Sequence, residues 1–229
     1  MAGYTGGWGV ALVDLDCDAT FLVNPEHSQY PASAGKIMVV IAALRAVQDG
    51  LLELEGELQG DIEIVLSLSL DAHADRINGK VTSEQIAAVL ERAGVSGDSR
   101  IEHSWRYAHF TPSDLARVWI SLVRGEQLNE ELTAYLMDLA TRPILGAFAW
   151  PFPPDFGIEG YVFGQKAGFW TSEAPVAYRV SAGYLRPEDG SSEGYVFAFM
   201  VRAVWEDLRG EWRRPVFPLV RDFMVRELD

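Results

Sequence analysis

The sequence predicts a mixed α/β fold of the α+β type, in which a five-stranded antiparallel sheet is flanked by helices and joined to a helical lobe. Strand-like segments lie at both ends of the 229-residue chain, and capped helical segments fill its middle. Between the first strands and the middle runs an almost wholly apolar stretch, residues 37–47. Apolar residues on every side are typical of a helix buried in a core. One antiparallel sheet that collects strands from both ends accounts for this order.

The N-terminal segments predict a hairpin followed by the buried helix. Trp8–Leu15 and Thr20–Asn24 have the composition of strands and are separated by a turn. The helix is expected from about Ser33 to Asp49, with Gly50 as its stop. Gly35 in its first turn costs about 1 kcal/mol relative to alanine, which indicates a close approach by another segment.

The middle of the chain is expected to be mostly helical. The acidic residues 53–61 are assigned to the surface, and residues 94–108 to irregular structure. A cap at Thr82 and Ser83 precedes an apolar stripe, and Thr111 followed by a proline is a second helix start. The expected helices are Ser83–Ala93, Thr111 to about Arg124, and Asn129–Leu139.

The C-terminal part predicts three strands and a closing helix. The last strand is apolar on both faces, so helices should cover it on both sides. The segment Pro143–Phe156 is expected to be a linker or rim. We expect a single domain over residues 1–229, with a sheet lobe from 1–50 and 157–229 and a helical lobe from about 51–156. The expected strands are Tyr161–Lys166, Val176–Leu185 and Tyr195–Val204, and the closing helix is Pro215–Leu228.

Composition limits the function classes. A net charge of -14 disfavours nucleic acid and anionic lipid, because both are bound by clusters of Lys and Arg. We expect a small-molecule or peptide-like substrate instead. The histidines and the single cysteine show no metal-ligand spacing, so neither a metal nor a cofactor is expected. No apolar run is long enough to span a membrane. The protein is expected to be cytoplasmic, or exported with a leader already removed; its oligomeric state is open.

Ser33 and Lys36 are the first candidates for chemistry. A spacing of three residues puts both side chains on one face of a helix. A lysine at the base of a buried helix is costly to desolvate, and activation of Ser33 would give it a role. On their own, the two residues are equally consistent with an ordinary N-cap serine and a lysine that extends its amine to solvent.

Two further motifs follow in order along the chain. Ser69-Leu70-Asp71 is close to Ser-Asp-Asn, and Lys166-Ala167-Gly168 is close to Lys-Thr-Gly, at the end of a strand ahead of a turn. With the Ser-x-x-Lys that begins at Ser33, they resemble the motifs of the serine β-lactamase and penicillin-binding D-alanyl-D-alanine peptidase superfamily, and of class A β-lactamases in particular. The resemblance covers nearly the whole chain and implies a β-lactamase/transpeptidase-like fold.

What the resemblance implies for chemistry is a serine hydrolase that works through an acyl-enzyme. Ser33 attacks an amide or ester carbonyl, and Lys36, whose pKa is lowered by desolvation, is the base or relay. Ser69 bridges Lys36 and the leaving group, and Lys166 holds positive charge near a substrate carboxylate. The oxyanion is bound by the backbone N–H groups of Ser33 and Phe169.

Two substitutions in the motifs depart from the family pattern. Asp71 stands where the family has asparagine, and its carboxylate either raises the pKa of Lys36 or pairs structurally with Lys36 or Lys166. Ala167, ahead of Gly168, replaces a hydroxyl residue that contacts the carboxylate of penicillin-like substrates. Both changes weaken the match to a standard β-lactamase.

A third departure concerns deacylation. Class A enzymes carry Glu-x-x-x-Asn between the second and third motifs, whereas the nearby Glu102 is followed four residues later by Arg106. We therefore expect poor hydrolysis of standard penicillins. The alternative is a catalytically weak or inactive binding protein that retains the penicillin-recognising fold.

Overall fold

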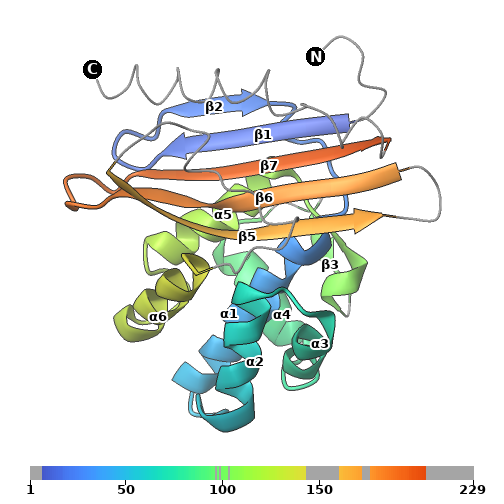
Figure 1. Cartoon of the computed structure of the whole chain (residues 1–229), viewed down its shortest axis with the longest axis vertical. Coiled ribbons are helices and arrows are strands. Elements are labelled where there is room, and N and C mark those ends of the chain that lie inside the picture. Colours follow the sequence, from blue (N-terminus) through green and yellow to red (C-terminus); the bar gives the residue numbers. More distant parts are fainter. Residues whose placement is uncertain are drawn as a thin grey trace.

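The strands from both ends of the chain meet in one five-stranded antiparallel sheet (Figure 1). The computed structural model describes residues 7–142 apart from residues 96, 98 and 103, and also residues 160–171 and 176–204. The strand order is β2-β1-β7-β6-β5, and every neighbouring pair is antiparallel. The strands are β1 (Gly7–Asp14), β2 (Thr20–Val23), β5 (Tyr161–Thr171), β6 (Val176–Pro187) and β7 (Tyr195–Val204). The predicted fold class is confirmed.

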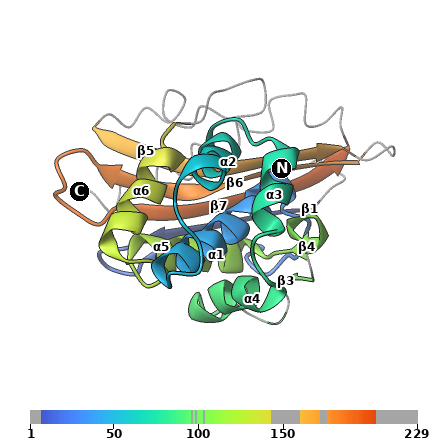
Figure 2. The ribbon, with the colours of Figure 1, turned by 90° about the horizontal axis from the view of Figure 1, so that it is seen from below.

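The described helices gather on one face of this sheet (Figures 1 and 2). The helix α5 packs directly against β1, β6 and β7, and α1 packs against α3 and α4. A short ladder of β3 (Arg100–Ile101) and β4 (Ala108–His109) flanks the 3₁₀ turn η2 (Trp105–Tyr107). The helices are α1 (Lys36–Gln48), α2 (Gly56–Ser67), α3 (Asp71–Asn78), α4 (Ser83–Arg92), α5 (Pro112–Val123) and α6 (Glu130–Ala140).

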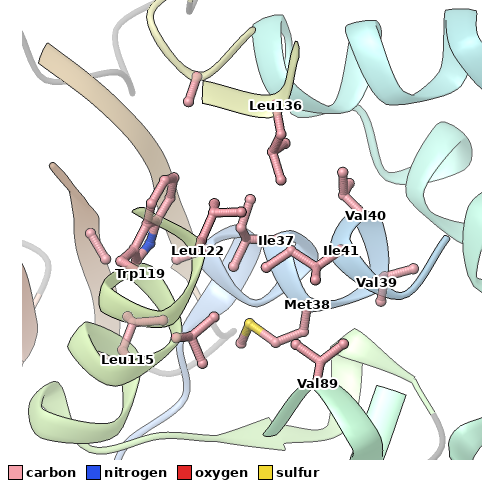
Figure 3. Packing of buried hydrophobic residues seen from close by; sticks show 14 of the residues in the cluster. Ile37, Met38, Val39, Val40, Ile41, Val89, Leu115, Trp119, Leu122 and Leu136 are labelled. Atoms are coloured by element: carbon pink, nitrogen blue, oxygen red, sulfur yellow. The ribbon is translucent and has the colours of Figure 1, made fainter. Parts of the chain in front are cut away.

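The helix α1 is the centre of the hydrophobic core. Its side chains from Lys36 to Leu44 are all buried, as the continuous apolar run predicts. Figure 3 shows Met38 next to Val89 of α4, while Leu122 of α5 and Leu136 of α6 approach from other sides. Because close-packed neighbours surround the helix, its N-terminal end is held in a fixed place beside the sheet.

The observed start of this helix differs from the predicted one. The sequence places the helix start at Ser33, but the α-helix begins at Lys36 and follows a 3₁₀ turn, η1 (Ala32–Gly35). Gly35 is the N-cap of α1, and no side-chain capping bond is present there. The interpretation of Ser33 as an ordinary N-cap is therefore wrong.

Two other predictions are also wrong. The assignment of residues 53–61 to the surface fits Glu53, Glu55 and Glu57, which are exposed, but it is wrong from Leu58 on, because α2 buries Leu58 and Asp61. The strand expected to end at Lys166 continues to Thr171, because β6 pairs with it along that whole length. Lys166 is therefore in the middle of a strand and not ahead of a turn.

The closing helix Pro215–Leu228 and the rim Pro143–Phe156 lie outside the described residues. The division into a sheet lobe from 1–50 and 157–229 and a helical lobe from about 51–156 stays a proposal. Within the described part of the chain, no helix combines the length and apolar character needed to cross a membrane.

Candidate active site

A pocket of about 530 Å³ lies where the η1 turn, the start of α3 and the edge strand β5 meet. Three of the residues proposed from the sequence line it: Ser33, Asp71 and Phe169. Lys36, Ser69 and Lys166 lie behind its wall and are linked to one another by hydrogen bonds. The structure thus brings residues that are 33 and 97 positions apart in the chain into direct contact.

Ser33 is presented to the pocket by a strained piece of backbone. Ala32, the residue before it, has a φ of 50°, in the left-handed region that residues with a side chain rarely adopt. Such a conformation costs on the order of 1–3 kcal/mol and persists only where the surroundings impose it. The Ser33 hydroxyl makes no hydrogen bond to another described residue. Ser33 itself lines the pocket.

Lys36 is fully buried, so it cannot extend its amine to solvent. Its Nζ donates to the Ser69 carbonyl and to Asp71 Oδ1, each at 2.6 Å. Burial lowers the pKa of Lys36, and the hydrogen bond and charge of Asp71 oppose that effect without cancelling it. Asp71 thus pairs with Lys36, one of the two lysines that the sequence offered as partners.

Ser69 connects the two lysines through different atoms. Its φ of 59° is also in the left-handed region, at the short connection between α2 and α3. The carbonyl accepts from Lys36, and the hydroxyl oxygen accepts from Lys166 Nζ at 2.7 Å. The Ser69 hydroxyl hydrogen therefore points away from Lys166, because that amine already donates to the oxygen.

Lys166 is 2% exposed and does not line the pocket. Besides Ser69, its amine donates to the Ala167 carbonyl at 3.0 Å. Burial, with the positive charge of Lys36 nearby, lowers the pKa of Lys166 to about 7. Burial therefore makes the neutral amine of Lys166 more accessible near neutral pH than that of an ordinary lysine.

Gly168 allows the strand β5 to touch the turn that carries Ser33. A Cβ at this position would lie 2.4 Å from the Pro31 carbonyl oxygen and 2.6 Å from the Ala34 nitrogen. The backbone after Gly168 therefore runs alongside the Ser33 backbone, with Phe169 at the pocket wall. Two neighbouring backbone N–H groups are the arrangement that an oxyanion needs.

The sequence did not single out the ion network around Asp71. Asp71 Oδ2 accepts from Arg106, whose guanidinium also holds Asp75, and Trp105 Nε1 donates to Asp75 at 3.2 Å. Asp71 and Asp75 are four residues apart on α3, a spacing that was visible in the sequence. Arg106 and Trp105 come from a segment assigned to irregular structure, and no sequence pattern tied them to α3.

An aromatic group at one end of the pocket was also missed. The rings of Tyr30, Trp170 and Tyr178 meet with centroids 5.6 to 5.8 Å apart. Trp170 and Tyr178 are cross-strand partners on β5 and β6, so their proximity follows from the strand register. All three rings line the pocket.

Glu102 lies in the pocket wall, although its sequence context lacks the family motif. Its carboxylate is half-exposed and lies 3.5 Å from Arg100 Nε. Among the described residues, no group of three or more His, Cys, Asp or Glu side chains is arranged to hold a metal ion.

The close approach at Gly168 predicts that Gly168→Ala destabilises the fold. The added methyl group overpacks the contact between β5 and the η1 turn, at a cost of about 1–3 kcal/mol in unfolding free energy. Denaturant unfolding measures this cost. Gly60→Ala is the control, because a Cβ on that α2 residue meets nothing within 4 Å. Equal unfolding free energies for the two variants would contradict the close approach.

The lowered pKa of Lys166 predicts a specific dependence of stability on pH. Between about pH 7 and 10 the unfolded chain binds a proton at this lysine that the folded chain has lost, so folding becomes more favourable as pH rises. Relative to Lys166→Met, the unfolding free energy of the unmodified protein should gain about 2 kcal/mol from pH 6 to pH 9. The corresponding difference for Lys80→Met, a partly exposed lysine, should stay flat. A flat difference for Lys166→Met as well would show that Lys166 keeps its proton.

Comparison with known proteins agrees with this geometry. The model of the β-lactamase enzyme family matches residues 1–69, the part that carries Ser33, Lys36 and Ser69. No curated protein matches the sequence. The solved structure of PBP-A has 18% sequence identity and a TM-score of 0.80, over 98% of this chain and 92% of that chain.

Two further structures extend the likeness. An acyl-enzyme complex of a PBP-A mutant with penicillin G has 18% identity and a TM-score of 0.77, over 96% of this chain and 91% of that chain. A β-lactamase from Sphaerobacter thermophilus has 19% identity and a TM-score of 0.70, over 89% of this chain and 85% of that chain. The chain therefore has the fold shared by β-lactamases and PBP-A, and its resemblance to the β-lactamase and penicillin-binding protein superfamily is supported.

Proposed function

We propose that the protein is a serine hydrolase that forms an acyl-enzyme on Ser33 with an amide or ester substrate and hydrolyses standard penicillins poorly. The observation that carries this proposal is the convergence of a pocket serine with two buried lysines that are both bonded to Ser69. Burying a lysine costs free energy. A catalytic site that uses the lowered pKa of a buried amine explains why this cost is tolerated.

Acylation begins with the neutral form of Lys36. The amine takes the Ser33 proton, directly or through a water, while Oγ forms a bond to the substrate carbonyl carbon. The carbonyl electrons move to oxygen, which the backbone N–H groups of Ser33 and Phe169 stabilise. Burial supports this role for Lys36, because it increases the fraction of the amine that is neutral near pH 7.

Departure of the leaving group requires a proton, and Ser69 is the donor we propose. Its hydroxyl gives a proton to the leaving nitrogen or oxygen and takes one from the Lys166 ammonium. The hydrogen bond from Lys166 Nζ to Ser69 Oγ is already in place. A lysine with a pKa of about 7 is well matched to this transfer. In this scheme Lys166 relays a proton and does not hold a substrate carboxylate.

The pocket lining favours a neutral substrate with an aromatic or bulky apolar acyl group. Among the described lining residues, Asp71 and Glu102 contribute two negative charges against one positive charge on Arg106, and Ala167 offers no hydroxyl to a carboxylate. The aromatic group of Tyr30, Trp170 and Tyr178 provides ring faces and edges for an aryl group. Among the described lining residues, a penicillin-like carboxylate would meet one cation, Arg106, and that guanidinium is already bonded to Asp71 and Asp75.

The second candidate is a binding protein with weak or no turnover. The short salt bridge between Lys36 and Asp71 favours it, since an amine that keeps its proton is no base. Among the described wall residues, Glu102 is the one acidic side chain besides Asp71, and its ion pair with Arg100 does not favour a role as the base for deacylation. The two candidates differ in whether Ser33 is acylated and how fast the acyl group leaves.

Covalent labelling distinguishes the two candidates. A fluorophosphonate probe should label the protein at one site, identified as Ser33 by intact mass and peptide mapping, because Lys36 activates that hydroxyl. Ser33→Ala should abolish the label, Lys36→Met should slow it at least about a hundredfold, and Ser83→Ala, an exposed serine at the start of α4, should leave it unchanged. A label that persists in Ser33→Ala would exclude Ser33 as the nucleophile.

The aromatic group predicts a preference among ester substrates. For p-nitrophenyl phenylacetate over p-nitrophenyl acetate, the ratio of kcat/KM should fall about tenfold in Trp170→Ala, because the phenyl ring loses a stacking partner. Trp170→Phe should keep most of the preference. If Trp170→Ala lowers both rates equally, this end of the pocket does not select the acyl group.

A further inference from the structure

Lys36 belongs to a network of three cationic side chains and two carboxylates. Lys36, Lys166 and Arg106 face Asp71 and Asp75, and we call these five residues the ion cluster. With every group charged, the cluster has three positive and two negative charges. Loss of one lysine proton makes it neutral, so the charge of Arg106 decides how readily that proton leaves.

Arg106 is held by several contacts in one orientation. Its Nη2 and Nε donate to the two oxygens of Asp75 at 2.8 and 3.2 Å, which is a two-pronged pairing. Its Nη1 reaches Asp71 Oδ2 at 3.3 Å. The guanidinium also lies over the ring of Trp105, 4.5 Å from the centroid. An arginine fixed at this many points keeps its charge at a constant distance from Asp71.

Trp105 contacts both Arg106 and Lys36. The ring is buried, and the Lys36 amine also lies 4.5 Å from its centroid. The indole N–H donates to Asp75, so the ring is fixed by the same carboxylate that holds Arg106. Both cations are therefore placed by one rigid aromatic side chain.

Asp71 is shared between the two cations through different oxygens. Oδ1 accepts from Lys36 at 2.6 Å, and Oδ2 accepts from Arg106. A carboxylate that faced Lys36 alone would strongly favour the ammonium form of that amine. We propose that Arg106 is a positioning residue that acts on Lys36 through Asp71, by drawing one oxygen and part of the charge of this carboxylate away from the amine.

This role accounts for the departure at Asp71. The resemblance leads one to expect an uncharged asparagine there, and a bound pair of Asp71 and Arg106 has no net charge either. Arg106, from a distant segment, therefore offsets part of the negative charge that Asp71 adds beside Lys36. The inference rests on the proposed function of Lys36 as a base, but the effect of Arg106 on the Lys36 proton can be measured without any reaction.

Other charged and titratable groups near Lys36 also affect the protonation of its amine. Asp71 and Asp75 of α3 favour its charged form, while Arg106 of η2 and Lys166 of β5 disfavour it. The Tyr30 phenol, whose pKa is raised by burial, stays neutral at working pH. Among the described residues these are the titratable groups that act on the amine, so substitutions at Arg106 and Asp71 change two known charges.

The first experiment follows the lysine amines directly by NMR. The chain has three lysines, Lys36, Lys80 and Lys166, so ¹³Cε-labelled lysine gives a spectrum that Lys80→Arg and Lys166→Arg can assign. In Arg106→Gln the midpoint of the Lys36 titration should rise by roughly half to one pH unit, because Asp71 is no longer shared. Arg124→Gln, another arginine that bonds a carboxylate outside this pocket, is the control and should leave it unmoved.

A double-mutant cycle tests whether the effect passes through Asp71. In an Asp71→Asn background, Arg106→Gln should shift the Lys36 midpoint by less than half as much. An equal shift in both backgrounds would mean that Arg106 acts on Lys36 directly, and no shift in either would mean that it does not act at all; each result overturns the proposal. If Arg106→Gln does not fold, Arg106→Met and the double variant provide the same comparison.

The second experiment measures the rate of Ser33 labelling against pH. Because labelling needs the neutral amine, Arg106→Gln should be several-fold slower near pH 7 and should recover at higher pH. A loss of rate that is equal at all pH values would indicate only a structural role and would overturn the proposal. If the unmodified protein is not labelled at any pH, the proposed function fails, while the NMR titration still decides the effect of Arg106.

Discussion

The site depends on one constraint, the burial of the Lys36 amine at the foot of the central helix. An amine without solvent must find its partners in the protein, and here they are the Ser69 carbonyl and Asp71. Those two contacts fix the connection between α2 and α3. That connection in turn presents the Ser69 hydroxyl to Lys166 on the sheet. The apolar run that forms α1 therefore does more than fill the core, because its buried first residue holds Ser69 and Asp71 in place.

Strained backbone conformations and close packing hold the residues of the site in place beside the pocket. Two residues next to the reacting groups, Ala32 and Ser69, have left-handed backbone conformations, and Gly168 allows backbone-to-backbone contact between the turn and β5. Each feature is unfavourable or impossible for an ordinary side chain. They are tolerated because α1 is held on all sides by the core. Part of the free energy gained by packing the core therefore offsets the cost of the strained backbone at the site.

The fold could be predicted from the sequence because its signals are local and repeated. Strand patterns at the ends, capped helices in the middle and the apolar α1 run gave the correct class and a single antiparallel sheet. The helix α2 was missed because its charged residues mask the spacing of Leu58, Ile62 and Val65. In the site, short motifs named Ser33, Lys36, Ser69 and Lys166, and their assigned roles stay predictions. Arg106 and the aromatic group could not be found, because their partners are far away in sequence or across a strand pair whose register no pattern specifies.

The strand order has a consequence for the assembly of the protein. β1 lies between β2 and β7. The N-terminal hairpin of β1 and β2 can therefore join the sheet only when β7, which ends at Val204, has been made. During synthesis the segment with Ser33, Lys36 and Ser69 emerges long before β5 brings Lys166. The proposed proton path through Ser69 is therefore incomplete until nearly the whole sheet has formed, since contacts between distant segments are made late. On the proposed mechanism, a nascent chain would carry Ser33 without Lys166, and the reactivity of this serine would arise together with the folded state.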